Sequence, residues 1–382
     1  MTQTPSSITK PTRRQFVGNG SALVLAAAHW TAPSKVSAAP SKVSAAPAIR
    51  TSKTRWAANE TVIGKGDFQY KVDHSFCKLP DKYKWQVSHG VAVDSQNNLY
   101  VVHEGRRKQK SHPSIFVFGP DGKFIRAFGS QFQGGGHGIE VRKEGDTEFL
   151  YVAAYQGVKS FAKMTLEGEI LWYKRAPVES GVYHDGEELA TEAGWNRKSF
   201  LPTNFAFLDD GGFLLADGYG SYFIHEFDKD AKWVRCFGGE GEKPGQFQVS
   251  HGLWIDRREG KTPSLYVTDR GRGKVQILDM DGKHIETLEG FGKPANFDIY
   301  QDLMLVPELL GLVTILDKDN KPLAQLGDGR ERLGEVEKLR EKPDQWTDGQ
   351  FVHPHDACFD NEGNIFVAEW VSSGRVTKLT RV

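Results

Sequence analysis

A sixfold repeat constrains the fold of this chain more than any other feature of its sequence. Each repeat starts with a polar anchor residue and continues into a strand of alternating apolar residues, and most repeats add a turn and further strands. The anchors are His89, His137, Asn204, His251, Asn296 and His355, spaced 48, 67, 47, 45 and 59 residues apart. Strand–turn–strand units of roughly 40 to 50 residues are typical of propeller blades. The sequence therefore predicts an all-β fold, a six-bladed β-propeller.

The two ends of the repeat region suggest how such a ring closes. The last repeat has three strand-like stretches before residue 382, and the segment Thr61–Val72 is available as a further outer strand. Pairing these two ends in one blade would avoid an exposed sheet edge. We expect the propeller to span residues 58–382. Charged insertions at 175–199 and 329–349 are expected to lie as loops over one face.

Composition narrows the class of partner. The chain has 49 basic and 49 acidic residues and a formal net charge of zero, which gives no reason to expect nucleic acid or an anionic lipid surface as a partner. A small-molecule or peptide substrate is expected instead. Three cysteines occur without any C-x-x-C spacing, so no disulfide framework is visible.

The first 50 residues have the pattern of an export signal followed by a linker. The run Thr12–Val17, "TRRQFV", precedes a mildly apolar stretch and then Ala/Ser/Pro-rich sequence in which the block "PSKVSAA" occurs twice. This order resembles a twin-arginine signal, and the apolar stretch is too short for a permanent membrane span. We expect a periplasmic or extracellular monomer without a membrane span. A basic disordered tail is the alternative interpretation.

The anchor residues also predict a metal site. The first strand of each propeller blade lines the central channel, so the anchors should form one ring. Alternate blades contribute His137, His251 and His355, and three converging imidazoles with one open position are typical of catalytic zinc. Alternatively, each histidine only hydrogen-bonds the neighbouring blade. The other histidines expected in loops or outer strands, at the solvated surface, are His112, His184, His225 and His284.

Four stretches carry a family resemblance over roughly residues 85–382. They are Pro244–Leu253 ("PGQFQVSHGL"), Asp217–Tyr219, the pair Asp269 and Arg270, and Pro354–Asp356. With these motifs the chain resembles the peptidyl-α-hydroxyglycine α-amidating lyases, six-bladed propellers with NHL-type repeats. That family cleaves a C-terminal hydroxyglycine into a peptide amide and glyoxylate.

The resemblance implies a role for each matching residue. It makes His137, His251 and His355 zinc ligands, Tyr219 the base that acts on the substrate hydroxyl, and Arg270 a ligand of the substrate carboxylate. Zinc and a nearby cation lower a phenol's pKa, and a guanidinium binds two carboxylate oxygens at once. The resemblance also places His353 beside the substrate, at a position where the family has methionine. It further implies a structural calcium ion, held by Asp356 and by main-chain oxygens near Val91 and Ile139.

The chain departs from the family pattern around the first blade. An arginine expected directly after His103 is replaced by Glu104, whose carboxylate would repel an anionic substrate. Arg106 and Arg107 follow closely and could restore the positive charge. His89 adds an imidazole to the ring.

Three functions are therefore open from the sequence. The first is a zinc lyase acting on an α-hydroxyglycine-like substrate. The second is a non-catalytic NHL propeller that binds a peptide, glycan or protein partner. The third and weakest is a calcium-dependent lactonase-type hydrolase, which would need acidic ligands at the channel where this ring has mainly His and Asn.

Overall fold

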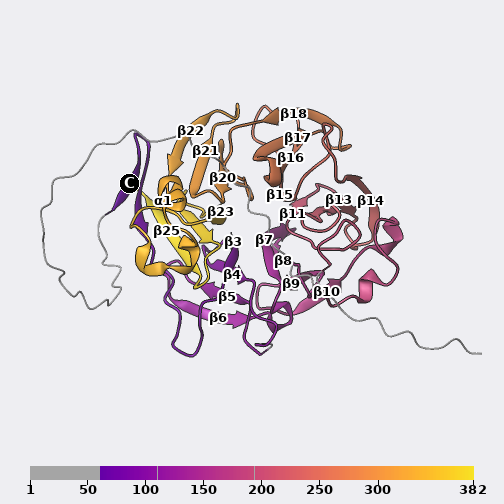
Figure 1. The fold of residues 1–382 in the computed structure, drawn as a ribbon, viewed down its shortest axis with the longest axis horizontal. Coiled ribbons are helices and arrows are strands. Elements are labelled where there is room, and N and C mark those ends of the chain that lie inside the picture. Colours follow the sequence, from indigo (N-terminus) through magenta and orange to yellow (C-terminus); the bar gives the residue numbers. More distant parts are fainter. Residues whose placement is uncertain (1–60, 110, 193) are drawn as a thin grey trace, which may run out of the picture. The chain divides into compact units, whose positions relative to one another are not determined.

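The predicted six-bladed β-propeller is confirmed. A computed structural model describes residues 61–109, 111–192 and 194–382, and within them six antiparallel sheets surround a common axis (Figure 1). The predicted export signal, the linker and residues 58–60 lie outside the described residues. In the described part of the chain, no helix is long and apolar enough to cross a bilayer.

The first five sheets each contain four strands that follow one another along the chain. The first two are formed by β3 (Ser88–Val93), β4 (Leu99–His103), β5 (Ile115–Phe118) and β6 (Phe124–Phe128), and by β7 (Gly136–Glu144), β8 (Thr147–Ala154), β9 (Ser160–Thr165) and β10 (Ile170–Lys174). The third and fourth are formed by β11 (Phe205–Phe207), β12 (Phe213–Ala216), β13 (Phe223–Phe227) and β14 (Trp233–Gly238), and by β15 (Ser250–Asp256), β16 (Ser264–Asp269), β17 (Lys274–Leu278) and β18 (His284–Leu288). The fifth is formed by β19 (Asp298–Tyr300), β20 (Leu303–Glu308), β21 (Leu312–Leu316) and β22 (Pro322–Leu326).

The sixth sheet combines both ends of the described chain. Its C-terminal strands are β23 (Pro354–Phe359), β24 (Ile365–Glu369) and β25 (Arg375–Arg381), and its N-terminal strands are β1 (Val62–Lys65) and β2 (Phe68–Asp73). Strand β2 pairs antiparallel with β25, with Tyr70 opposite Arg381. The segment expected as one strand is thus a hairpin of two. Its turn contains Gly66 at φ 57°, a left-handed conformation that glycine adopts without strain.

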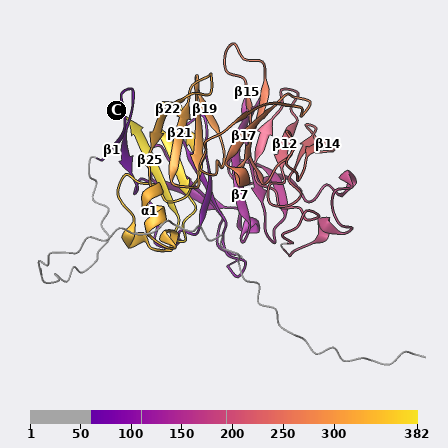
Figure 2. The same ribbon diagram turned by 45° about the horizontal axis from the view of Figure 1, so that its top comes forward.

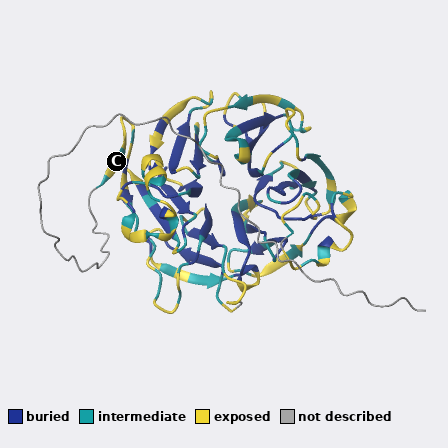
Figure 3. Cartoon of the chain, in the orientation of Figure 1, coloured by how far each residue is buried: buried dark blue, intermediate teal, exposed yellow. Residues whose placement is uncertain are grey.

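The apolar core lies between neighbouring blades. The second strand of the first blade, β4, is buried along its whole length, whereas the outermost strand of the fourth blade, β18, has only exposed and half-buried positions (Figure 3). Tyr100 and Val102 of the first blade pack with Ile139 and Val152 of the second in one cluster. Because both faces of each sheet are covered in this way, the inner strands are held rigidly around the axis.

The second charged insertion is more ordered than a loop. Between β22 and β23 it contains a short helix, α1 (Arg330–Glu335), and two 3₁₀ turns, Leu339–Glu341 and Pro343–Gln345. Its Leu339 and Trp346 pack with Val371, which lies just after β24. Both views place α1 beside β25 (Figures 1 and 2). The insertion is therefore fastened to the sixth sheet.

Candidate metal centre

Four inner strands bring histidines to the axis by the same local device. His89, His137, His251 and His355 each lie at the start of their strand, where the pairing with the next strand shifts register. Such a β-bulge re-aims a side chain out of the regular alternation of the strand. The residue after three of them is glycine, and at Gly252 an added Cβ would lie 2.5 Å from the carbonyl oxygen of Ala295 in the next blade. The His-Gly pairs in the sequence thus reflect a close approach between blades.

The three predicted ligands form a nearly equilateral triangle. The ring centroids are separated by 4.7 Å between His137 and His251 and by 4.8 Å from each of these to His355. The Nε2 atoms of His137 and His251 lie 3.1 Å apart, within the spacing of about 3–3.5 Å expected for two ligands of one zinc ion. All three side chains are buried.

Hydrogen bonds to the backbone fix the tautomer of each ring. Nδ1 of His137 contacts the carbonyl oxygen of Thr203 at 3.0 Å, Nδ1 of His251 that of Ala295 at 2.7 Å, and Nδ1 of His355 that of His89 at 2.9 Å. A carbonyl only accepts, so in each ring Nδ1 carries the proton and Nε2 presents a lone pair toward the axis.

The converging lone pairs fit a metal ion. Burial lowers the pKa of His137, His251 and His355 well below the ordinary value, so all three are neutral, the form in which imidazole ligates. The Nε2 atoms of His137 and His251 face each other without a proton on either, and Nε2 of His355 is buried without a hydrogen-bond partner. A buried three-histidine group of this kind could hold a metal ion, and an all-imidazole donor set suits a transition-metal dication.

His89 lies closer to the triangle than the sequence suggested. Its ring centroid is 5.0 Å from that of His137 and 4.6 Å from that of His355, and one ring nitrogen from each of these three residues lies within 4.8 Å of the others. Its outer contacts are weaker, however. Nδ1 lies 3.4 Å from the Val87 carbonyl oxygen, and Nε2 lies 3.8 Å from a carboxylate oxygen of Glu104. We therefore take His137, His251 and His355 as the primary ligand set and His89 as a fourth imidazole within reach.

Tyr219 stands directly at the triangle. Its hydroxyl oxygen is 3.0 Å from Nε2 of His251 and 3.3 Å from Nε2 of His137. The guanidinium carbon of Arg270 lies 4.8 Å from the centre of the Tyr219 ring. Burial raises the pKa of the phenol, and the positive charge of Arg270 acts in the opposite direction. The structure thus brings Tyr219 and Arg270 together with the three histidines.

The loop that carries Tyr219 is held by Asp217. This buried carboxylate accepts hydrogen bonds from the backbone N–H of Leu201 at 2.6 Å, from the backbone N–H of Ser221 at 2.7 Å and from the Ser221 hydroxyl at 2.6 Å. Tyr183 adds a fourth donor at 3.0 Å. The motif "DGYGS" therefore places Tyr219 through the aspartate at its start.

His225, expected at the surface, is fully buried behind this loop. Trp233 Nε1, which can only donate, contacts His225 Nδ1 at 3.2 Å, so the proton of the neutral ring lies on Nε2. Nε2 donates to the Tyr183 oxygen at 2.7 Å, and the Tyr183 hydroxyl then donates to Asp217. The sequence analysis missed this series of hydrogen bonds. Tyr183, which covers His225, comes from the first charged insertion, and its path could not be predicted from the repeat.

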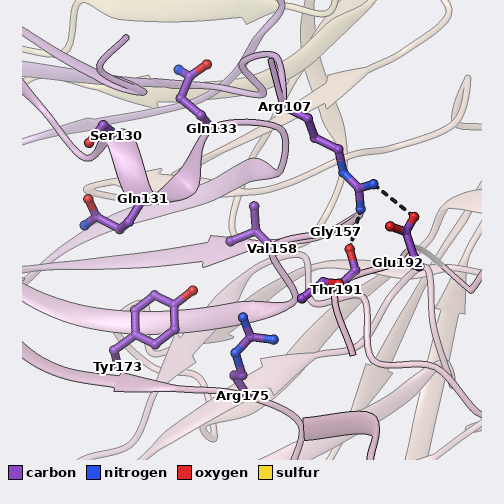
Figure 4. A pocket seen from close by; sticks show the side chains of 10 residues that line it. All are labelled: Arg107, Ser130, Gln131, Gln133, Gly157, Val158, Tyr173, Arg175, Thr191 and Glu192. Carbon is purple, nitrogen blue, oxygen red and sulfur yellow. Dashed lines mark hydrogen bonds and ion pairs between the residues drawn. The ribbon is translucent and has the colours of Figure 1, made fainter. Parts of the chain in front are cut away.

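Glu104 and the two arginines after it have different surroundings. The Glu104 carboxylate accepts hydrogen bonds from Tyr155 at 3.1 Å and from Gln156 at 2.7 Å, beside His89. Arg107 instead pairs with Glu192 at 3.0 Å and donates to the carbonyl of Thr191, at the edge of a peripheral cavity of about 570 Å³ (Figure 4). Arg106 is exposed. The positive charge expected from Arg107 is thus not directed at the histidine triangle.

A second group of polar residues lies next to the histidines. Asp356 accepts hydrogen bonds from the backbone N–H of Val91 at 3.0 Å and from the side chain of Asn296 at 2.8 Å. Together with Glu140 and Asp298 it lines a cavity of about 210 Å³. Burial raises the pKa of both aspartates to about 7, and burial with repulsion by these aspartates raises that of Glu140 well above its usual range. Clustered carboxylates are the donor chemistry of calcium.

The predicted calcium ligands, the Asp356 carboxylate and main-chain oxygens near Val91 and Ile139, stay a prediction. Val91 and Asp356 both line this cavity, and the Val91 N–H donates to the Asp356 carboxylate. Glu140 and Asp298 were missed by the sequence analysis. Their only sequence signal is an acidic residue two or three positions after an anchor.

His353 lies near the ring without joining the triangle. It has φ 58°, which is uncommon for a non-glycine residue, and its Nδ1 contacts the carbonyl oxygen of Leu309 at 2.6 Å. The residue that follows it is the first of β23, and His355 comes next. The left-handed backbone at His353 thus sets the direction in which His355 enters the channel.

Comparisons with known proteins agree with this architecture. No known protein-family model matches the chain. It is 29% identical over 203 residues to peptidyl-α-hydroxyglycine α-amidating lyase 1 of Drosophila melanogaster, covering 47% of this chain and 35% of that protein. It is 27% identical over 219 residues to peptidyl-glycine α-amidating monooxygenase B of Xenopus laevis, covering 50% of this chain and 23% of that protein.

Among solved structures, a streptogramin B lyase superposes with a TM-score of 0.51 at 10% identity, covering 81% of this chain and 97% of that one, which is a likeness of fold. In the two sequence comparisons, this chain covers about a third or less of the length of each relative. The chain is a six-bladed β-propeller with distant sequence similarity to peptide-amidating enzymes.

Proposed function

We propose that this protein is a zinc-dependent lyase that cleaves the carbon–nitrogen bond of an α-hydroxyglycine-type substrate and releases glyoxylate. One observation carries the proposal: three Nε2 lone pairs, on tautomers fixed by backbone carbonyls, converge beside the hydroxyl of Tyr219. The sequence similarity to amidating enzymes supports the choice of reaction.

The residues present fit the chemistry of this reaction. His137, His251 and His355 would hold the zinc ion, which when bound supplies Lewis-acid stabilisation of negative charge that develops on a substrate oxygen. Tyr219, as the phenolate, takes the proton of the substrate hydroxyl at its Oη. The carbon–oxygen bond becomes a carbonyl as the electron pair of the carbon–nitrogen bond moves to nitrogen, which gains a proton. No oxidant is needed.

Two further parts of the protein have supporting roles in the proposal. Arg270, next to Tyr219, binds the substrate carboxylate and favours the phenolate by its charge. A calcium ion near Asp356, with Val91 and Ile139 alongside, stabilises the lower part of the channel. Export by the twin-arginine pathway would place the enzyme in the periplasm or outside the cell.

Metal analysis and a turnover assay test the proposal together. The purified protein should contain about one zinc per chain and release glyoxylate from an N-acyl-α-hydroxyglycine. His251→Ala should lose both, whereas His184→Ala, a change at an exposed histidine, should keep both. Stoichiometric zinc without glyoxylate release would refute the lyase and favour a propeller that binds a peptide, glycan or protein.

A calcium-dependent hydrolase is the second candidate, because Glu140, Asp298 and Asp356 supply the acidic ligands that the ring itself lacks. Calcium without zinc, together with lactone hydrolysis that requires these carboxylates, would favour it over the lyase.

A further inference from the structure

The second insertion directs one arginine back toward the centre of the propeller. The guanidinium carbon of Arg340 lies 3.3 Å from the centre of the Trp370 ring, and the Arg340 carbonyl accepts a hydrogen bond from the backbone of Ser372 at 3.1 Å. The Nε atom of Arg340 is fully buried and has no hydrogen-bond partner. A buried donor without an acceptor costs about 1–3 kcal/mol, and more when it is charged. This nitrogen is therefore suited to an acceptor that arrives with a ligand.

Trp370 links Arg340 to the metal centre. Its backbone N–H donates to the carbonyl of His353 at 2.8 Å, and its ring centroid lies 6.0 Å from that of His353. His353 is two residues before His355, the ligand from the sixth blade. Arg340 thus stacks on a residue that contacts the segment leading into His355.

The charges around Arg340 lead to the same location. Burial lowers the pKa of Arg340, and the nearby negative charge of Glu104 opposes this change. Glu104 is therefore close enough to Arg340 to interact with its charge.

We propose that Arg340, supplied by the insertion, binds the substrate carboxylate and makes the protein selective for α-hydroxy acids over their neutral amides. This inference rests on the proposed function for the substrate's identity. Trp370 holds the guanidinium plane by stacking, which fixes the direction of its donors before the ligand arrives. A carboxylate would accept the hydrogen bond of Nε, and the positive charge of Arg340 would offset the repulsion of that carboxylate by Glu104.

Substitution of the arginine by a neutral residue of similar length tests this role. In Arg340→Gln, binding of glyoxylate measured by calorimetry on the zinc-loaded protein should weaken about 10- to 150-fold, the factor for a lost hydrogen bond to a charged group. The kcat/KM for an N-acyl-α-hydroxyglycine should fall by a similar factor, and that for its primary amide by less than about twofold. Zinc content should not change. Arg340→Lys should recover part of the preference for the carboxylic acid substrate over its primary amide.

A matched control lies in the same insertion. Arg330→Gln removes an exposed arginine that pairs with Asp328, and it should leave both substrates and glyoxylate binding unchanged. Equal losses for acid and amide in Arg340→Gln, or undiminished glyoxylate binding, would overturn the inference and leave Arg340 as a packing residue of Trp370.

The binding measurement separates the two proposals. If the wild-type protein binds glyoxylate through Arg340 but releases none from the hydroxyglycine, the carboxylate site stands and the lyase reaction falls. If it releases glyoxylate while Arg340→Gln keeps its acid preference, the reaction stands and the carboxylate site falls. Wild-type protein that does not bind glyoxylate at all would also overturn the inference.

Discussion

The buried His225 predicts a specific loss of stability in mild acid. Burial lowers its pKa to about 3 in the folded protein, whereas an unfolded chain has an ordinary histidine pKa of about 6.5. Between these two pKa values the unfolded state binds a proton and the folded state does not. The free energy of unfolding therefore falls as the pH drops below about 6.5. From these two values, His225 destabilises the fold by about 0.2 kcal/mol at pH 7 and about 1.4 kcal/mol at pH 5.5, a difference of about 1.2 kcal/mol.

The structure explains why the folded state resists protonation. A second proton would have to sit on Nδ1, which already accepts the N–H of Trp233 at 3.2 Å, so two donors would face each other in a buried site. His225→Gln removes the titrating group while keeping one donor and one acceptor. The variant is expected to be less stable than wild type at pH 7, but to lose about 1.2 kcal/mol less between pH 7 and pH 5.5.

Urea unfolding at these two pH values measures the difference. Other buried histidines also lower the free energy of unfolding in acid, and they do so in both proteins. The difference between the two proteins in the change from pH 7 to pH 5.5 therefore isolates His225. His184→Gln, at an exposed position, should retain the wild-type slope. Equal acid losses in wild type and His225→Gln would refute the assignment of a neutral, Trp233-bonded ring.

Three further predictions concern the centre of the propeller. Tyr219→Phe should lower glyoxylate release by about 10²–10⁴ while elemental analysis still finds zinc, because a base is lost but no ligand is; a variant with wild-type turnover would exclude Tyr219 as the base. Glu104→Gln should lower KM for the α-hydroxy acid and leave that for the amide unchanged, since it removes a negative charge beside His89; the reverse pattern would mean that Glu104 binds the substrate. Gly252→Ala should lower both the melting temperature and the zinc content, because its Cβ would lie 2.5 Å from the carbonyl that orients His251; normal values of both would show that the blades can separate there at little cost.

Local sequence patterns determined the architecture and the centre of the site. Alternation of apolar residues specifies strands, and turns at short range specify which strands pair, so each of the first five blades is encoded within about 50 residues of chain. His137, His251 and His355 could be assigned to one ring because they occupy the same position in their repeats, and a repeated unit places equivalent residues equivalently around an axis. Tyr219 and Arg270, in the third and fourth repeats, were assigned from motifs that carry the family resemblance.

The tertiary structure alone decided which residues surround that centre. Arg107 lies in the loop between β4 and β5 of the first blade but pairs with Glu192, whereas Arg340, in an irregular insertion, stacks on Trp370. Insertions have no periodicity from which their path could be predicted, and their course depends on contacts such as that of Trp346 with Val371. His225 shows the same limit, since its burial depends on Tyr183, 42 residues earlier in the chain. The repeat places equivalent residues around the common axis and can be read from the sequence. Residues such as Arg340 and Tyr183, which have no equivalent in the other repeats, are positioned only by long-range packing.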